Sequence, residues 1–180
     1  MTFGEYLDKM RGGGKSPPGV GLREVGWSML GAFLGIGSCC YLSGRYLEPR
    51  DLTLIIASFG ASAVLIYAAV KSPLAQPRNL IGGHIFSAFV GVACYQLLGG
   101  SWYSAALAVS CAIAVMLLTG TLHPPGGATA LLAVTGSAQI HNLGFLYVLV
   151  PVGLGALIML GIALAVNNLS MNRRYPEWWF

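Results

Sequence analysis

The chain has 180 residues, of which 56% are hydrophobic and only 9% are charged, and its formal net charge is +4. Soluble domains carry roughly 25% charged residues, and a soluble core of this size could not bury so much apolar surface. Together with a mean hydropathy of +0.70, these values exclude a soluble domain and predict an all-α polytopic membrane bundle. The apolar runs do not alternate with polar residues, which argues against a transmembrane β-barrel.

Residues 1–22 are predicted to form a cytoplasmic or interfacial arm. Apolar residues recur there at helical spacing, at Phe3, Tyr6, Leu7 and Met10. This pattern fits a short helix lying on an anionic membrane surface, and a solvated start of the chain fits it equally. The arm contains no apolar run of the kind found in secretory signals, so we expect no cleavable signal peptide.

Residues 23–168 are predicted to form the membrane domain, and 169–180 a cytoplasmic tail. The domain contains six apolar segments, at about 25–43, 52–70, 79–98, 102–119, 126–139 and 143–166. Several approach the ~20 residues needed to cross a bilayer. The fifth would rise only about 18 Å as a helix, so it needs non-helical chain at one or both ends. Asn79 and Ser101 are expected to cap the third and fourth segments.

Positive charge predicts how the segments cross the membrane. Basic residues lie before the first segment, between the second and third, and after the sixth: Lys9, Arg11, Lys15, Arg23, Lys71, Arg78, Arg173 and Arg174. Six crossings place all three groups on the cytoplasmic side, as the positive-inside bias favours. Both termini are therefore expected in the cytoplasm, and the short fifth segment is expected to complete a crossing.

A weak internal repeat divides the domain into halves at 24–98 and 101–167. Residues 59–65 resemble residues 126–132, and each run lies in the middle segment of its half. Three crossings per half would make the second half inverted, which is a recurring plan of transporters with a binding site at the midplane. Equating Gly60 with Gly127 would place the fifth segment's start near mid-depth.

The run His123-Pro124-Pro125-Gly126-Gly127 begins that fifth segment. Proline is favourable in a first helical turn, and Pro124 also holds His123 out of the α region. Free backbone N–H groups are expected at the helix start, on Gly126, Gly127 and Ala128. With the positive end of the helix dipole, they predict an anion site.

Further candidate groups surround this break. Hydroxyls are available from Thr121 and Thr129 and, across the pseudo-twofold axis, from Ser58 and Ser62, beside Gly60. His123 could donate a hydrogen bond or carry a proton. His84, after two glycines in the third segment, is also a functional candidate, because histidine within a membrane is unusual. The alternative is structural, with His123 bonded to a carbonyl at a kink and His84 bonded within the bundle.

Other classes of function are disfavoured. The histidines are far apart in sequence, with His141 expected in a short loop, and the apolar segments two to six contain no acidic residue. We therefore predict no metal site, no cofactor and no cation or proton pump built on carboxylates. No nucleophile–base pair is evident, so no enzyme activity is expected. The four cysteines are interpreted as small buried hydrophobic residues.

Residues 122–130 and 73–84 together resemble the HPP family of integral membrane proteins, and the similarity extends over roughly residues 20–168. The resemblance implies a small helical membrane protein of bacteria or plastids. Plastid members are described as nitrite transporters, and most bacterial members are only presumed transporters. Family members are often described with four or five spans, from which the six predicted here depart. Some bacterial relatives carry a C-terminal CBS domain, which is not expected after Phe180.

The sequence therefore predicts a membrane transporter or channel for a small inorganic anion, with nitrite as the favoured substrate. The resemblance implies the bacterial cytoplasmic (inner) membrane, or the plastid inner envelope if the source is a plant. A homodimer or higher homo-oligomer in the lipid bilayer is expected, because 180 residues leave little room for a private pathway. No nucleic acid partner is expected. The alternatives are a non-transporting scaffold or sensor, and a channel for a neutral small molecule.

Overall fold

The computed structural model describes residues 3–10, 14, 16, 18–48 and 56–180. These residues form helices joined by short connections, and none of them lies in a strand. The all-helical prediction is therefore confirmed for the part of the chain that the structure describes.

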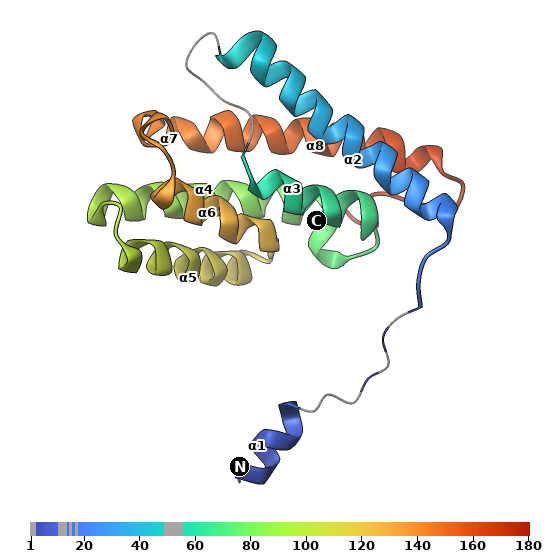
Figure 1. Cartoon of the computed structure of the whole chain (residues 1–180), viewed down its shortest axis with the longest axis horizontal. Coiled ribbons are helices and arrows are strands. Elements are labelled where there is room, and N and C mark those ends of the chain that lie inside the picture. The colour runs from blue at the N-terminus through green and yellow to red at the C-terminus, as the bar shows by residue number, and fades with distance from the viewer. Residues whose placement is uncertain (1–2, 11–13, 15, 17, 49–55) are drawn as a thin grey trace.

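The α-helices are α1 (Phe3–Met10), α2 (Leu22–Leu42), α3 (Ser58–Ala63), α4 (Pro77–Leu98), α5 (Trp102–Thr119), α6 (Pro124–Thr135), α7 (Ala138–Leu143) and α8 (Leu154–Leu169). Among the described residues, three π-helical stretches extend them, η1 (Ser43–Leu47), η3 (Val64–Ala68) and η5 (Val148–Gly153). A single 3₁₀ turn, η4 (Pro73–Ala75), precedes α4. The arm residues predicted to be helical do form α1, which lies apart from the helical body (Figure 1).

Four helical stretches among the described residues are long and apolar enough to cross a membrane: Leu22–Leu47, Pro77–Leu98, Trp102–Thr119 and Val148–Leu169. Two further helical stretches are shorter, Ser58–Ala68 and the 12-residue α6. The short fifth segment was predicted. The second segment was predicted from residue 52, but its described helix begins only at Ser58, and residues 52–55 lie outside the described part.

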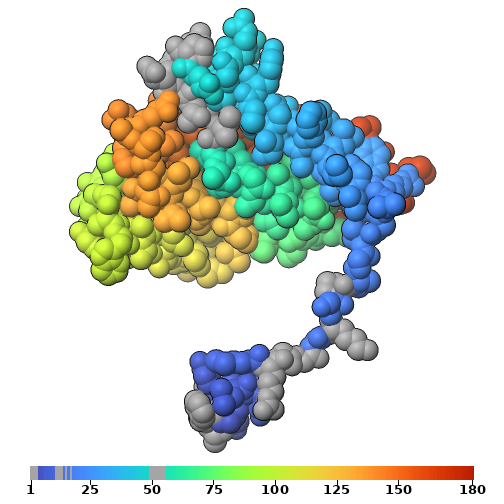
Figure 2. Space-filling model, viewed as in Figure 1, coloured from blue at the N-terminus to red at the C-terminus, as the bar shows by residue number. Residues whose placement is uncertain are grey.

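The helices pack as two groups around the short helices. α4, α5 and α6 contact one another, while α2 packs against α8 and crosses it obliquely (Figure 1). α3 contacts both α2 and α6, and the three share one face of the molecule (Figure 2). Glycine permits the close approaches: a Cβ on Gly91 of α4 would lie 2.8 Å from the Cα of Ala130 in α6. Small residues at helix contacts are typical of membrane proteins.

The outer surfaces of these helices are apolar. Phe33 of α2, Trp102 and Leu118 of α5 and Leu157 of α8 are all more than half exposed. Hydrophobic side chains on the outside of apolar helices of this length suit contact with lipid tails. In contrast, polar side chains on α3, α4 and α6 are buried: Ser58, Ser62, His84, Ser87 and Thr129.

Three expectations about local structure can be compared with the described helices. Ser101 caps α5 as predicted, since its Oγ accepts from the N–H of Ser104 at 3.2 Å. The prediction for Asn79 is wrong, because α4 already begins at Pro77 with Gln76 as its N-cap. The proline takes the first helical position, as its ring favours. His141, expected in a loop, lies instead in α7.

Candidate functional site

The connection from α5 to α6 turns the chain back within the bundle. Gly120 ends α5 in the left-handed conformation with φ +64°, and the N–H of Thr121 donates to the carbonyl of Met116 at 2.9 Å. His123 is extended, with φ −139° and ψ 103°, and Pro124 starts α6. This is the geometry that a residue before proline prefers, so the predicted break and helix start are both present.

The first turns of α4 hold this connection in place. The Asn79 side chain donates to the carbonyl of Leu122 at 2.9 Å, and Arg78 donates to the carbonyl of Thr119 at 2.6 Å. Carbonyl groups left unpaired at the end of α5 and in the connection thereby receive partners. α4 thus fixes the backbone on both sides of Thr121 and sets the position of His123.

Glycine brings α4 and the start of α6 into contact. A Cβ on Gly83 would collide with the Cβ of His123. One on Gly126 would lie 2.7 Å from the Oγ of Ser87 and 2.8 Å from the carbonyl oxygen of Gly83. Because neither glycine has a side chain, the histidine on α4 and the histidine before α6 can share one layer of the bundle.

Five predicted site residues meet there in one hydrogen-bonded group, which we call the histidine cluster: Ser58, Ser62, His84, His123 and Thr129. The Oγ of Ser62 lies 2.7 Å from Nε2 of His84 and 2.9 Å from Nε2 of His123. Nδ1 of His84 lies 2.8 Å from Oγ1 of Thr129, which donates to Ser58 at 2.8 Å. All five are at most 2% exposed. The cluster joins α3, α4, α6 and the chain before α6.

Three further groups complete the surroundings of the cluster. Nδ1 of His123 lies 2.8 Å from the carbonyl oxygen of Leu74 in η4. The hydroxyl of Tyr147 donates to the carbonyl of Thr129 at 3.1 Å. The ring of Phe59 meets His84 edge-on, with centroids 5.3 Å apart. Sequence reasoning missed these contacts, because a backbone carbonyl and a partner distant in the chain leave no local signal.

Ser87 is a polar group that sequence reasoning missed altogether. Its side chain is fully buried, and its Oγ has no hydrogen-bond partner among the described residues. It follows His84 by three positions and so lies on the same face of α4, against Gly126 of α6. That spacing was the available signal.

The remaining predicted residues lie outside the cluster. Gly127 and Ala128 are on the other face of α6, in a groove of about 490 Å³ whose lining is apolar: Val109, Ile113, Met116, Leu122, Pro124, Gly127, Ala128 and Leu131. Gly60 is exposed beside a separate pocket of about 240 Å³. The hydroxyl of Thr121 pairs with that of Thr119 at 2.8 Å.

One detail of the predicted anion site needs correction. The N–H of Gly126 was expected to be free, but it donates to the carbonyl of His123 at 2.8 Å. The first turn of α6 closes tightly, with a bond of the 3₁₀ type that is common at helix ends. An anion at this helix start would therefore meet side chains of the cluster rather than that N–H.

The chemistry of the cluster is that of neutral donors and acceptors. Each imidazole N–H and each hydroxyl can donate a hydrogen bond to a ligand in place of a bond within the cluster. No carboxylate among the described residues bonds to them. No group of three His, Cys, Asp or Glu side chains in the described part could hold a metal ion. The arrangement suits an anion that accepts hydrogen bonds.

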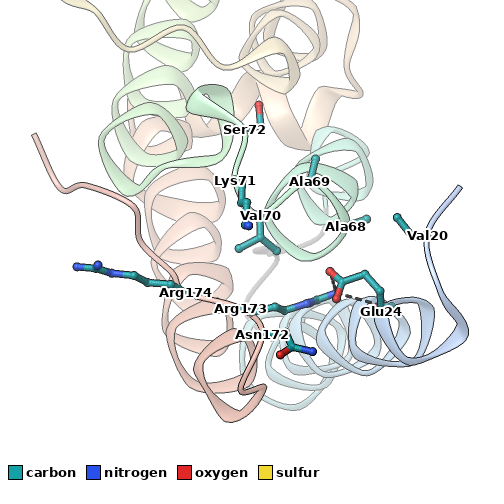
Figure 3. Close-up of a pocket in the computed structure, with 10 residues that line it drawn as sticks. All are labelled: Val20, Glu24, Ala68, Ala69, Val70, Lys71, Ser72, Asn172, Arg173 and Arg174. Atoms are coloured by element: carbon teal, nitrogen blue, oxygen red, sulfur yellow. Dashed lines mark hydrogen bonds and ion pairs between the residues drawn. The ribbon is translucent and has the colours of Figure 1, made fainter. Parts of the chain in front are cut away.

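A second polar region lies at one end of the bundle. A pocket of about 390 Å³ is lined by the start of α2, residues 68–72 and residues 172–174 (Figure 3). Arg173 reaches across it to Glu24 at 2.7 Å, with Lys71 nearby and Arg174 pointing away (Figure 3). These are three of the segments that the charge pattern predicted to share one side of the membrane.

Comparison with known proteins places the chain among membrane proteins. It matches the family described as "HPP, transmembrane region" over residues 17–176. Two curated proteins of Dictyostelium discoideum, each named only as a transmembrane protein, match the whole chain. One is 48% identical over 184 residues and the other 46% over 186. The chain covers 59% and 65% of their lengths, so it spans about three fifths of each.

No solved structure matches the chain. The family match covers most of the sequence and includes both motifs, 73–84 and 122–130, that bring Leu74, His84, His123 and Thr129 together. The protein is therefore a multi-pass integral membrane protein that belongs to the HPP transmembrane family.

Proposed function

We propose that this protein moves a small inorganic anion, nitrite or one like it, across the membrane through the histidine cluster. The observation that carries the proposal is the burial of two imidazoles and three hydroxyls among apolar helices. Polar groups buried among apolar helices are costly in a membrane, which favours a functional role for them. No chemical conversion of the anion is part of the proposal.

The groups around the cluster favour an anion over a cation. Ser87 adds a buried hydroxyl without a partner beside the first turn of α6, and the positive end of the α6 dipole points the same way. Because the cluster is fully buried, an anion must replace one of its internal bonds to bind. Short helices that start at mid-depth against one another are a known setting for transporter sites.

The proposal includes six crossings in two inverted halves, 24–98 and 101–167. Its support is the pairing of helices. α2 packs on α3 and on α8, and α5 packs correspondingly on α6 and on α4. The two short middle helices contact each other, and Ser58 at the start of α3 bonds to Thr129 of α6. A twofold axis in the membrane plane relates these pairs.

Orientation and assembly follow from charge and size. The positive-inside bias assigns the end of the bundle that contains Lys71, Arg173 and Arg174 to the cytoplasm. Both termini are proposed to lie on the same side. The bacterial inner membrane stays a prediction, since the two relatives come from Dictyostelium. A homodimer is also proposed, and cross-linking in native membranes tests it.

Nitrite uptake into proteoliposomes tests the function. Uptake is measured at alkaline pH, where passive leak of nitrous acid is small, against protein-free vesicles. His123→Ala is expected to lower uptake at least tenfold, because it leaves Ser62 and the Leu74 carbonyl without their partner. His141→Gln is the matched control, since this histidine stacks on Tyr95 outside the cluster. Folded wild-type protein without uptake would refute transport and favour the scaffold or sensor.

A further inference from the structure

The histidine cluster contains an unbroken chain of hydrogen bonds. It runs from the carbonyl of Leu74 to His123, then to Ser62, His84 and Thr129, with every donor–acceptor distance between 2.7 and 2.9 Å. Each imidazole uses both of its ring nitrogens. A histidine bonded on both sides can take a proton on one nitrogen and release one from the other.

When both histidines are neutral, counting hydrogens allows one arrangement of these four hydrogen bonds. The Leu74 carbonyl can only accept, so Nδ1 of His123 must donate to it. Nε2 of a neutral His123 then accepts from Ser62, and Ser62 in turn accepts from Nε2 of His84. Nδ1 of His84 is left to accept from Thr129. Four donors supply four hydrogens for four bonds.

Thr129 provides the alternative arrangement. Its hydroxyl is also aimed at Ser58, to which it donates at 2.8 Å, and its one hydrogen cannot serve two acceptors. When it points at Ser58, Nδ1 of His84 must donate to Thr129. The series of hydrogen bonds from Leu74 to Thr129 then needs one proton more than it contains when both histidines are neutral. That extra proton can reside on either histidine.

We propose that His84, Ser62 and His123 relay a proton, and that this proton crosses the membrane together with the anion. The step balances: Nε2–H of one imidazolium gives its proton to the Ser62 oxygen while the Ser62 hydrogen passes to Nε2 of the other imidazole. No other reactant is consumed. The inference rests on the proposed anion transport and adds its coupling ion.

Electrostatics link the proton to the anion. An unpaired charge buried in an apolar bundle is strongly disfavoured. The other titratable group that faces the cluster among described residues is the hydroxyl of Tyr147, which bonds to the Thr129 carbonyl. The nearby cation on α4, Arg78, is directed to Thr119. An imidazolium and a bound anion therefore neutralise each other, and each favours the arrival of its partner.

The relay also has a direction within the bundle. Leu74 lies in η4, close in sequence to Lys71 of the basic end. His84 is seven residues into α4, about 10 Å along the helix axis. The hydrogen-bonded chain therefore leads from the end assigned to the cytoplasm toward the start of α3, which matches a route across half of the membrane.

Transport in proteoliposomes tests the coupling, with nitrite uptake and internal pH recorded together. Wild-type protein is expected to acidify the lumen by about one proton per nitrite, with uptake unaffected by a potassium–valinomycin potential. Ser62→Ala removes the bridge, so the proton-to-nitrite ratio should fall severalfold and uptake should become sensitive to potential. Ser110→Ala is the control and should keep the ratio, because the exposed Ser110 hydroxyl on α5 bonds to the Ala106 carbonyl outside the cluster.

The outcomes separate the two proposals. Nitrite uptake that is electrogenic and moves no proton in the wild type would overturn the relay and leave the transport proposal standing. Absence of uptake would instead overturn transport. A second measurement needs no folded variant: ¹⁵N spectra of histidine-labelled wild-type protein in nanodiscs. The relay predicts Nδ1–H on His123 at alkaline pH and one proton shared by the pair on acidification with nitrite. Two independent titrations would contradict it.

Discussion

At the scale of single residues, Thr129 has the most partners in the cluster. Its hydroxyl meets His84, Ser58 and the carbonyl of Pro125, and its own carbonyl accepts from Tyr147. A side chain with one hydrogen and this many partners sets the orientation of its neighbours. The predicted equivalence of Thr129 and Ser62 is in keeping with this, since both hydroxyls contact His84.

We expect Thr129→Val to lower nitrite uptake at least tenfold and to cost about 1–3 kcal/mol of folding free energy. Valine keeps the shape but leaves Nδ1 of His84 and the Ser58 hydroxyl without a partner. Thr135→Val on the same helix is the control, since that hydroxyl is exposed and bonds only to the Leu131 carbonyl. Uptake and thermal unfolding in detergent measure both effects; equal behaviour of the two variants would contradict the assignment.

The residue types of the cluster could be predicted from the sequence, but which of the candidate residues face one another could not. Histidine, serine and threonine within apolar segments stand out in the sequence, and Ser58, Ser62, His84, His123 and Thr129 do converge. Gly127 and Ala128 do not face them, because successive helical residues turn by about 100°. Which face of α6 meets α4 depends on the Gly83 and Gly126 contacts, which join distant parts of the chain.

At the scale of elements, glycine decides how closely α4 and α6 pack. Gly126→Ala would place a methyl 2.7–2.9 Å from Ser87 Oγ, Gly83 O and Met116 Sδ. Overpacking of this kind should cost about 1–3 kcal/mol. Gly127→Ala is the matched control, since its nearest neighbour would be 3.9 Å away and alanine is the better helix former.

Thermal unfolding of the two alanine variants in detergent measures the difference. Gly126→Ala should unfold several degrees below the wild type, while Gly127→Ala should unfold at or above the wild-type temperature. The reverse order would mean that the contact between α4 and α6 is looser than described.

Element boundaries were predictable where chemistry is local. α5 spans the predicted 102–119, and α6 begins at the prolines. Gln76 rather than Asn79 precedes α4, because the position of Pro77 outweighs the capping preference of asparagine. The late start of the described second helix, at Ser58, was missed, since an apolar run does not say how much of it is helical. The π-helical stretches were missed for the same reason, because an apolar run does not reveal which type of helix it forms.

At the scale of the whole molecule, Arg173 ties three parts of the chain together. Its guanidinium donates to the Tyr67 carbonyl, the Asn167 side chain and the Ser28 hydroxyl, and it pairs with Glu24. The Arg173 side chain is only 3% exposed. Arg173, one of the basic residues from which the cytoplasmic side was predicted, thus also links α2, η3 and α8.

Arg173→Gln should therefore destabilise the fold by about 2–4 kcal/mol, at the lower end of buried ion pairs because Glu24 is partly exposed. Arg174→Gln is the control, since the Arg174 side chain is exposed and points away from Glu24 (Figure 3). A loss below 0.5 kcal/mol, read from unfolding in mild detergent, would mean that the network contributes little.

The six-crossing topology is the last expectation, and cysteine labelling in native membranes decides it. In a variant with the four native cysteines replaced by alanine, single cysteines are introduced at Lys71, Trp102 and Arg174. Lys71 and Arg174 line one pocket, whereas Trp102 starts α5 after the far end of α4. An impermeant maleimide should therefore label Lys71→Cys and Arg174→Cys only from the cytoplasmic side, and Trp102→Cys only from the other. If α6 merely re-entered, the chain would cross five times and Arg174→Cys would label from the side opposite Lys71→Cys. That result would also remove the twofold relation between the halves, because α6 would no longer correspond to α3.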